Sequence, residues 1–254
     1  MTAENIIPSA DLIDLFPGID ESLPLEIPSL SLGQRSGQMP VYLPYEHAVV
    51  AGIVRLLQPR RLLEFGTAQG KTTYILAANS PEDAEVLTLD IAAEEPSDYT
   101  LKCLNGDDAL GRAFAGSVHA DKITQIFRKT ADGCPEALEG RDAAFDYLHV
   151  DADHSYSGVK ADSRLALDLA GPEAILVWHD FYMFPDYIAQ GPERRGVFPY
   201  LNELAGTGEI ALRHILGTYF VVGCKAWAHD LPGKVFQPGE FRGPFGERIV
   251  RLGG

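Results

Sequence analysis

The densest set of reactive side chains lies near the middle of the chain. There, "LHVDADHSY" (148–156) places two aspartates, a histidine, a serine and a tyrosine at the end of an apolar run. A second apolar run, "AILVWHD" (174–180), also ends in a histidine and an aspartate. Groups of these types can hold a cation or take a proton during a reaction. The alternative interpretation is a turn that only reverses the chain. The helices and strands predicted around these residues decide between the two interpretations.

Strand and helix patterns alternate from Tyr45 onward. Short apolar runs predict strands at 60–65, 85–90, 123–128, 145–151 and 174–180. Helical periodicity predicts helices at 45–57, 71–79 and 155–170, the last beginning after a cap at Asp153. Two runs on either side of Gly217 predict a terminal β-hairpin. This alternation predicts an α/β protein with a mostly parallel sheet covered on both faces.

Carboxylates close four of these apolar runs, at Glu64, Asp90, Asp151 and Asp180. Ligands of open α/β sheets bind beyond the carboxyl ends of the strands. We therefore expect the functional site at this edge. Asp151 and Asp180 should lie side by side if their strands are neighbours.

The chain divides into an N-terminal arm, residues 1–40, and one domain, residues 41–254. The arm contains five of the 17 prolines together with short apolar patches, which indicates extended structure. It could lie on the body of the protein or reach across a homodimer. The loop after the fifth predicted strand, 179–204, is rich in aromatic residues and holds Arg194 and Arg195. We expect some aromatic residues of this loop to pack in the core and others to form a wall against the substrate.

Composition excludes several classes of function. The formal charge of -15 and the scattered basic residues argue against a nucleic-acid partner. No apolar stretch is long enough to span a bilayer, and no secretory signal is present, so we expect a cytoplasmic protein with no membrane partner. The motifs described below, and not the composition, indicate a small-molecule substrate.

A glycine loop lies between the first predicted strand and its helix in "LLEFGTAQGKTTYIL" (62–76). Gly66 allows a sharp turn, and Gly70 allows backbone to approach a ligand. The spacing differs from both the P-loop and the G-x-G-x-x-G dinucleotide motif, which disfavours a nucleotide-dependent oxidoreductase. Asp90 could accept hydrogen bonds from both hydroxyls of a ribose. Glu64, before the glycines, suits a ligand with an ammonium group, and S-adenosylmethionine has both features.

Residues 45–224 resemble the class I S-adenosylmethionine-dependent methyltransferases. The segment "LLEFGTAQGKTT" resembles their first motif. The segment from "FDYLHVDADHSY" to "LVWHDFY" resembles a bacterial branch related to catechol O-methyltransferase and macrolide-sugar O-methyltransferases. The resemblance implies a Rossmann-like, doubly wound sheet of seven strands with an antiparallel last strand. It also implies methyl transfer to a hydroxyl of a sugar, phenol or natural product, in secondary metabolism.

The resemblance also assigns cofactor residues. Residues that would hold the methionine moiety are Gly66, Thr67, Gly70 and Thr72. Asp90 would bind the ribose, Asp132 would lie near the adenine, and Glu64 and Asp151 would border the same site. For Asp132, a turn aspartate before Gly133 is the alternative.

The two strand-end aspartates are the expected metal ligands. Neighbouring carboxylates repel, so one pKa should rise or a cation such as Mg²⁺ should lie between Asp151 and Asp180. These positions are metal ligands in the resembling enzymes. The resembling enzymes usually have an acid or asparagine after the second aspartate, where this chain has Phe181. His179 or a distant carboxylate would have to complete the site.

His154 is the expected general base, with Asp151 as its catalytic neighbour. It lies three residues after Asp151, where the catechol enzyme has its catalytic lysine. An imidazole titrates near neutrality and can take a hydroxyl proton as the methyl group moves. A methyltransferase-like scaffold that binds cofactor without catalysis is the competing hypothesis, and Phe181 is the residue that favours it.

Overall fold

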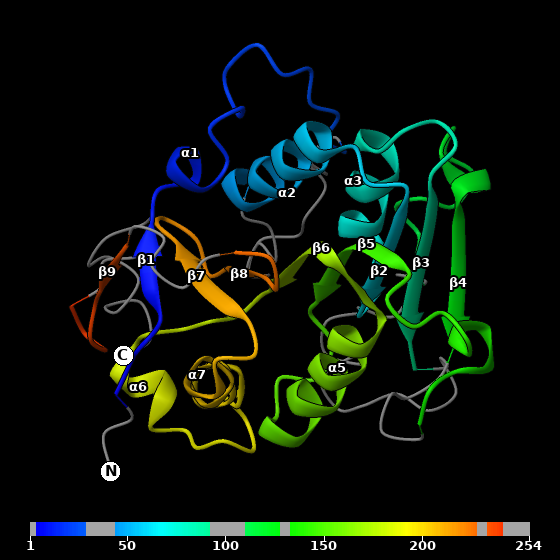
Figure 1. Ribbon diagram of the computed structural model, residues 1–254. Coiled ribbons are helices and arrows are strands. Elements are labelled where there is room, and N and C mark those ends of the chain that lie inside the picture. The colour runs from blue at the N-terminus through cyan, green and yellow to red at the C-terminus, as the bar shows by residue number, and fades with distance from the viewer. Residues whose placement is uncertain (1–3, 29–43, 92–109, 128–132, 228–232, 241–254) are drawn as a thin grey trace, which may run out of the picture.

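The structure, a computed structural model, describes residues 4–28, 44–91, 110–127, 133–227 and 233–240. Within these residues one sheet has the strand order β4-β3-β2-β5-β6-β8-β7-β1-β9 (Figure 1). The strands are β1 (Pro8–Ala10), β2 (Arg61–Phe65), β3 (Glu85–Asp90), β4 (Ile123–Phe127), β5 (Phe145–Val150), β6 (Ala170–Trp178), β7 (Ala211–Ile215), β8 (Val221–Cys224) and β9 (Lys234–Val235). The α-helices are α1 (Leu12–Leu15), α2 (Pro44–Leu57), α3 (Lys71–Asn79), α5 (Tyr156–Leu169), α6 (Pro185–Ile188) and α7 (Val197–Thr207).

The predicted seven-stranded arrangement is present as the part of the sheet from β4 to β7. Strands β4, β3, β2, β5 and β6 run parallel, and β8 is antiparallel to both β6 and β7. The expected number of strands was too small, because β1 and β9 extend the sheet beyond β7. These strands have three and two residues, and β1 includes Pro8, so neither has the alternating pattern that identifies a strand.

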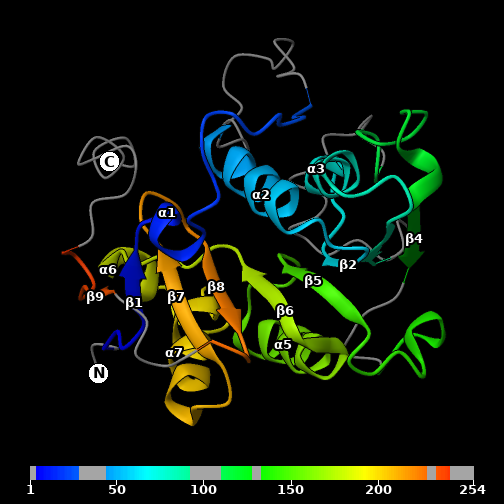
Figure 2. The same cartoon turned by 45° about the horizontal axis from the view of Figure 1, so that its top comes forward.

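Helices cover both faces of the sheet. Figures 1 and 2 show α1, α2 and α3 on one face and α5, α6 and α7 on the other. Because side chains alternate along a strand, β6 divides its apolar residues between two cores. Ile175 and Val177 join the core beneath α2 and α3, whereas Leu176 and Trp178 join the core beneath α5 and α7.

The loop expected after the fifth strand is interrupted by helix, which corrects the prediction. Helix α7 buries Val197, Phe198, Leu201 and Leu204, a spacing that places them on one face. Pro199 lies in the first turn, where a proline is tolerated because the turn's N–H groups have no partner within the helix. The aromatic residues and prolines of this segment concealed the helical spacing.

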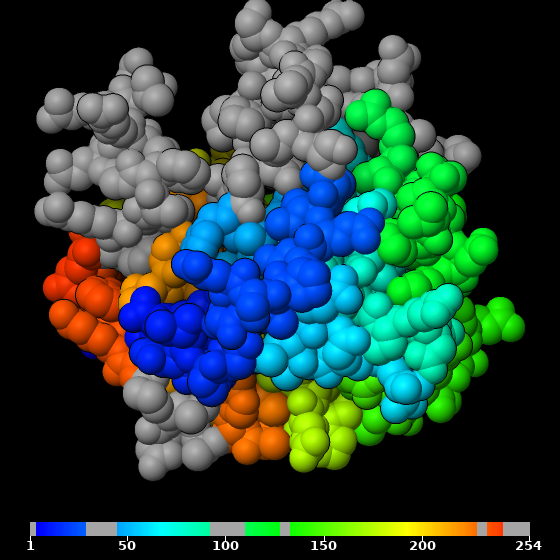
Figure 3. Space-filling view, turned by 90° about the horizontal axis from the view of Figure 1, so that it is seen from above, coloured from blue at the N-terminus to red at the C-terminus, as the bar shows by residue number. Residues whose placement is uncertain are grey.

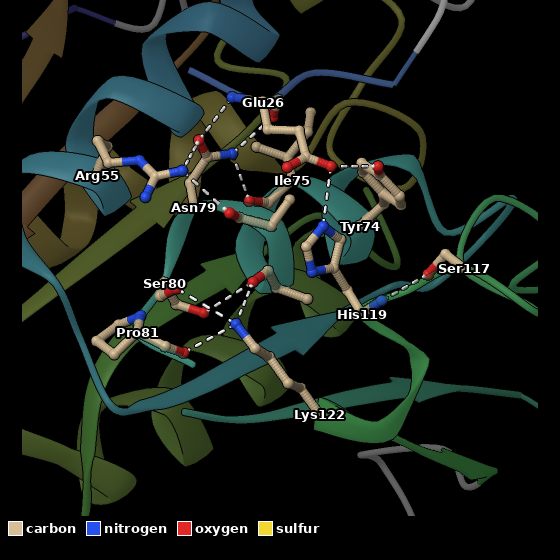
Figure 4. Close-up of polar contacts among 12 residues, drawn as sticks. Glu26, Arg55, Tyr74, Ile75, Asn79, Ser80, Pro81, Ser117, His119 and Lys122 are labelled. Atoms are coloured by element: carbon tan, nitrogen blue, oxygen red, sulfur yellow. Dashed lines mark hydrogen bonds and ion pairs between the residues drawn. The ribbon is translucent and has the colours of Figure 1, made fainter. Parts of the chain in front are cut away.

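The N-terminal segment crosses the molecule over the α2 face (Figure 3). It starts at β1, which pairs with β7, and reaches α3 through Glu26. Asn79 accepts from the Glu26 backbone N–H at 2.9 Å and donates to its carbonyl oxygen at 2.7 Å (Figure 4). The Glu26 carboxylate accepts from the Tyr74 hydroxyl at 2.6 Å and contacts His119 Nε2 at 2.9 Å. The segment is thereby fastened to the helix that follows the glycine loop.

No helix in the described part of the chain is both long and apolar enough to cross a membrane.

Candidate active site

Three strands end at one edge of the sheet and place three of the predicted carboxylates there. Asp90 is the last residue of β3, Asp151 follows β5, and His179 and Asp180 follow β6. Strands β5 and β6 are neighbours, with Val150 opposite Trp178. This pairing brings Asp151 and Asp180 together, as the sequence predicts.

Two imidazoles bridge the two carboxylates, and we call these four residues the Asp–His cluster. His154 Nε2 lies 3.3 Å from Asp151 Oδ1, and its Nδ1 lies 2.9 Å from Asp180 Oδ2. His179 Nδ1 lies 3.3 Å from Asp151 Oδ2 and 3.4 Å from Asp180 Oδ1. Each ring therefore contacts one oxygen of each aspartate, and the two rings use different oxygens.

Charge attraction within the cluster outweighs burial. Burial alone would raise the pKa of each aspartate, but the positive charges of His154 and His179 lower the pKa of Asp180 to about 2. The pKa of Asp151 is also lowered, against its burial, by the charge of His179 and hydrogen bonds from both rings. Burial opposes charge on the rings as well, yet the aspartates raise the pKa of His154 to about 10 and that of His179 well above its ordinary value. The cluster therefore favours ionised carboxylates and protonated rings.

The donor atoms of this cluster fit a divalent cation. Ligand atoms of Asp151, His154 and Asp180 lie within 4.8 Å of one another. Carboxylate oxygens suit Mg²⁺ and Mn²⁺, and an imidazole nitrogen suits Zn²⁺ and other transition metals. A nitrogen that ligates must give up its proton, so cation binding would release protons from the cluster.

Glu46 is a member of the site that the sequence analysis missed. It lies near the start of α2 and is 4% exposed. Its Oε2 lies 3.1 Å from His179 Nε2, and its Oε1 accepts from the Tyr219 N–H at 2.6 Å. The signal that could have found it is a carboxylate on the apolar face of a helix, one turn before Val49 and Val50.

Phe181 does not face the site. Asp180 has a φ of 60°, in the left-handed region that a non-glycine residue rarely adopts. The Phe181 N–H donates to the Tyr219 carbonyl oxygen at 3.0 Å, and its ring stacks on Phe198 with 5.2 Å between centroids. The turn at Asp180 thus directs its carboxylate toward the cluster and the next side chain into the core.

His154 is fixed by the elements on either side of it. Ser155 caps α5 by accepting from the Gly158 N–H at 3.1 Å, which corrects the expectation that Asp153 is the cap. Asp153 instead accepts from the Ser155 N–H at 2.8 Å. The His154 carbonyl oxygen accepts from the Gly196 N–H at 2.7 Å, which ties it to the start of α7.

The glycine loop touches the backbone at Asp151. Gly66 has a φ of +99°, and a Cβ atom there would lie 2.1 Å from the Asp151 carbonyl oxygen. Gly70, with a φ of +77°, precedes the first residue of α3. A side chain at Gly66 would therefore separate β2 from the residue that follows β5. The expected cofactor loop and the Asp–His cluster are adjacent.

Asp90 holds this loop in place. Its carboxylate accepts from the Ala68 and Ile91 N–H groups, both at 2.8 Å. Burial raises the pKa of Asp90, and hydrogen bonds from backbone N–H groups partly oppose this.

Glu64 lies beneath the loop and is 1% exposed. Its carboxylate accepts from the Thr73 and Thr88 hydroxyls, and burial raises its pKa to about 8. The Thr67 hydroxyl lies 2.7 Å from that of Thr88. Thr72 is half-buried in the first turn of α3. Asp132, expected near an adenine, lies outside the described residues.

The aromatic segment after β6 has residues in the core and residues beside Asp180. Phe198 joins the core. Tyr182 lies beside Asp180, with its ring centroid 4.5 Å from that of Tyr219 and 4.9 Å from that of Tyr187. The Arg195 guanidinium lies 4.5 Å from the Tyr187 ring centroid.

Comparison with known proteins agrees with the fold and the motifs. Residues 63–181 match a family described as "Methyltransferase domain". The O-methyltransferase of Bacillus cereus in complex with SAH has a TM-score of 0.56 at 18% identity, over 72% of this chain and 81% of that chain. The O-methyltransferase TomG of Streptomyces achromogenes, which is involved in tomaymycin synthesis and was solved with SAM, has a TM-score of 0.55 at 21% identity, over 72% and 80% of the two chains.

A curated relative is the uncharacterized protein y4gI of Sinorhizobium fredii, which is 27% identical over 128 residues. That match takes in 50% of this chain and 14% of the relative. The chain thus has the fold of the class I S-adenosylmethionine-dependent O-methyltransferases, and the resemblance stated from the sequence is confirmed at this level.

Proposed function

We propose that this protein transfers a methyl group from S-adenosylmethionine to a hydroxyl of a small molecule. The observation that carries the proposal is the contact between Gly66 and Asp151, because it joins the glycine loop to the Asp–His cluster. Methyl transfer from a sulfonium is an in-line displacement, so its rate depends on alignment of donor and acceptor. SAM and SAH in structures of the same fold support the cofactor. TomG, with its role in tomaymycin synthesis, supports a natural product as one class of acceptor.

The cofactor would lie along the glycine loop. Gly66, Thr67, Gly70 and Thr72 would border the methionine moiety, while Asp90 would accept from the ribose hydroxyls. Glu64 lies beneath the loop, where a proton on its carboxylate removes a buried negative charge. Asp132 is proposed for the adenine on sequence grounds.

His154 would accept the hydroxyl proton of the acceptor. It must be neutral to do so, and its pKa is raised to about 10 by the two aspartates. Positive charge beside Asp151 and Asp180 would lower that pKa. A divalent cation held by these aspartates would supply such charge and would also lower the pKa of an acceptor hydroxyl.

The first test is calorimetric titration of S-adenosylhomocysteine into the wild-type protein and an Asp90→Ala variant. Loss of hydrogen bonds to the ribose should cost about 1–3 kcal/mol, or roughly 5- to 150-fold in affinity. Asp146→Ala is a matched control. The Asp146 carboxylate also accepts from backbone N–H groups, those of Arg60 and Arg61, but at the amino end of the sheet.

The control variant should bind S-adenosylhomocysteine as the wild type does. If the wild type does not bind it, the methyltransferase proposal fails and the glycine loop is only a turn. If Asp90→Ala binds as tightly as wild type, the ribose assignment fails.

A further inference from the structure

The two imidazoles of the Asp–His cluster have different partners. His154 directs one ring nitrogen at each aspartate. His179 directs only Nδ1 at the aspartates, at 3.3 Å and 3.4 Å, while its Nε2 lies 3.1 Å from Glu46 Oε2. The His154 ring is therefore enclosed by the two aspartates, whereas the His179 ring has a third carboxylate, that of Glu46, on the side away from them.

The second arrangement is the one found around metal-ligating histidines. Such a histidine almost always donates its other N–H to a carboxylate, a carbonyl or water, which fixes the tautomer and orients the ring. Glu46 is placed to do this for His179. With a cation bound between the aspartates, the proton would remain on Nε2, and the Nδ1 lone pair, on the side of Asp151 Oδ2 and Asp180 Oδ1, would face the cation.

Glu46 is itself rigidly held. Its second carboxylate oxygen accepts from the Tyr219 N–H at 2.6 Å, and the Tyr219 carbonyl oxygen accepts from the Phe181 N–H at 3.0 Å. Glu46 is thereby linked through the backbone to the turn that carries Asp180. A shift of Glu46 would move the histidine and disturb the aspartate together.

We propose that His179 is the nitrogen ligand of a divalent cation bound between Asp151 and Asp180, and that Glu46 is the positioning residue that holds it. The assignment rests on the proposed function, since the cation is the one that would assist methyl transfer. The assignment supplies a third ligand, His179, from the position before Asp180. Phe181, at the position after Asp180, packs in the core instead. The assignment also leaves His154 for the proton of the acceptor.

The donor set selects among cations. Two carboxylates and one imidazole suit Mn²⁺, Co²⁺ or Zn²⁺ better than Mg²⁺, which prefers oxygen ligands and keeps several waters. We therefore expect Mn²⁺ to bind the protein more tightly than Mg²⁺, the cation expected from the sequence, does.

The test uses Mn²⁺ itself as the probe, in calorimetry and in pulsed electron paramagnetic resonance, which detects nitrogen bound to the ion. Wild type should show a nitrogen coupling that His179→Gln loses and His154→Gln keeps. Glu46→Gln should weaken Mn²⁺ binding by about 10- to 100-fold. Glu26→Gln is the matched control, because Glu26 pairs with His119 at 2.9 Å away from the cluster and should leave Mn²⁺ binding unchanged.

The inference is overturned if wild type does not bind Mn²⁺, if the nitrogen coupling is absent or persists in His179→Gln, or if Glu46→Gln binds Mn²⁺ as wild type does. Titration with S-adenosylhomocysteine in the same preparations separates the two proposals. If the protein binds S-adenosylhomocysteine but not Mn²⁺, the methyltransferase proposal stands and the assignment of His179 as a metal ligand fails. Cofactor binding by each variant also shows that it is folded.

Discussion

Glu64 is a buried carboxylate that binds a proton in the folded protein at neutral pH. Burial raises its pKa from an ordinary value of 4.5 to about 8. Between these two values the folded chain holds a proton that the unfolded chain releases, so this residue makes the free energy of unfolding fall as pH rises. The slope can reach about 1.4 kcal/mol per pH unit.

Glu64→Gln should remove this part of the pH dependence. The amide resembles the protonated acid and cannot ionise, so the variant should gain stability relative to wild type as pH rises from about 4.5 to about 8. Urea denaturation across that range measures the difference. Glu139→Gln, at an exposed carboxylate, is the control and should follow the wild-type profile. An unchanged slope in Glu64→Gln would show that Glu64 is already ionised in the folded state.

His154 is the residue on which the proposed chemistry depends. A screen of phenols and sugars with labelled S-adenosylmethionine would supply an acceptor. With it, His154→Ala should lower kcat by about 10²- to 10⁴-fold, the range for loss of a general base. S-adenosylhomocysteine affinity should be retained, because the proposed function places His154 beside the acceptor and not beside the cofactor. Turnover equal to wild type would remove the base assignment.

Some of these residues were predictable from the sequence and some were not. Asp151 and Asp180 each end an apolar run, so local sequence places them at the carboxyl ends of strands. Glu46 does not end an apolar run, and its place on the apolar face of a predicted helix does not identify a partner. Its partner His179 lies 133 positions away, and only the packing of α2 against the sheet brings the two together. A contact of this kind depends on tertiary structure.

The unit formed by β2, the glycine loop and α3 places the glycine loop beside the Asp–His cluster. Its boundaries were predicted within one residue, because the apolar run and the glycines give strong local signals. Helix α7 was missed because prolines and aromatics obscured its spacing. The positive φ of Asp180 was not predictable, since no glycine marks that turn.

Gly66→Ala tests how tightly this unit is packed. The added methyl would meet the Asp151 carbonyl oxygen at 2.1 Å, in addition to the strain of a φ of +99°. We expect a loss of about 2–4 kcal/mol in unfolding free energy. Gly140→Ala, with a φ of +73° and no atom within 4 Å of the new Cβ, should show the backbone strain alone, about 1 kcal/mol. Chemical denaturation measures the unfolding free energy of both variants. Equal losses would refute the close packing of Gly66 against Asp151.

On the scale of the whole molecule, the parallel sheet and its covering helices were predictable, because their apolar periodicity is local. The N-terminal segment was predicted only as an arm. Its apolar residues Ile7 and Phe16 join the two cores. Its polar contacts are made with single residues, such as Asn79 of α3 with Glu26 and Asn202 of α7 with Ile6. Isolated asparagines have no periodic pattern, so their partners could not be identified from the sequence.

The position of β1 has a consequence for synthesis. The Ser9 hydroxyl lies 2.9 Å from a nitrogen of His214, and the Asn5 N–H donates to Gln237, a residue 232 positions later. A ribosome makes the chain from its N-terminus, so β1 leaves the ribosome long before β7 and β9, the strands on either side of it. Strand β1 is therefore made well before the two strands that it pairs with. Until β7 and β9 are made, the nascent chain holds β1 without a neighbouring strand.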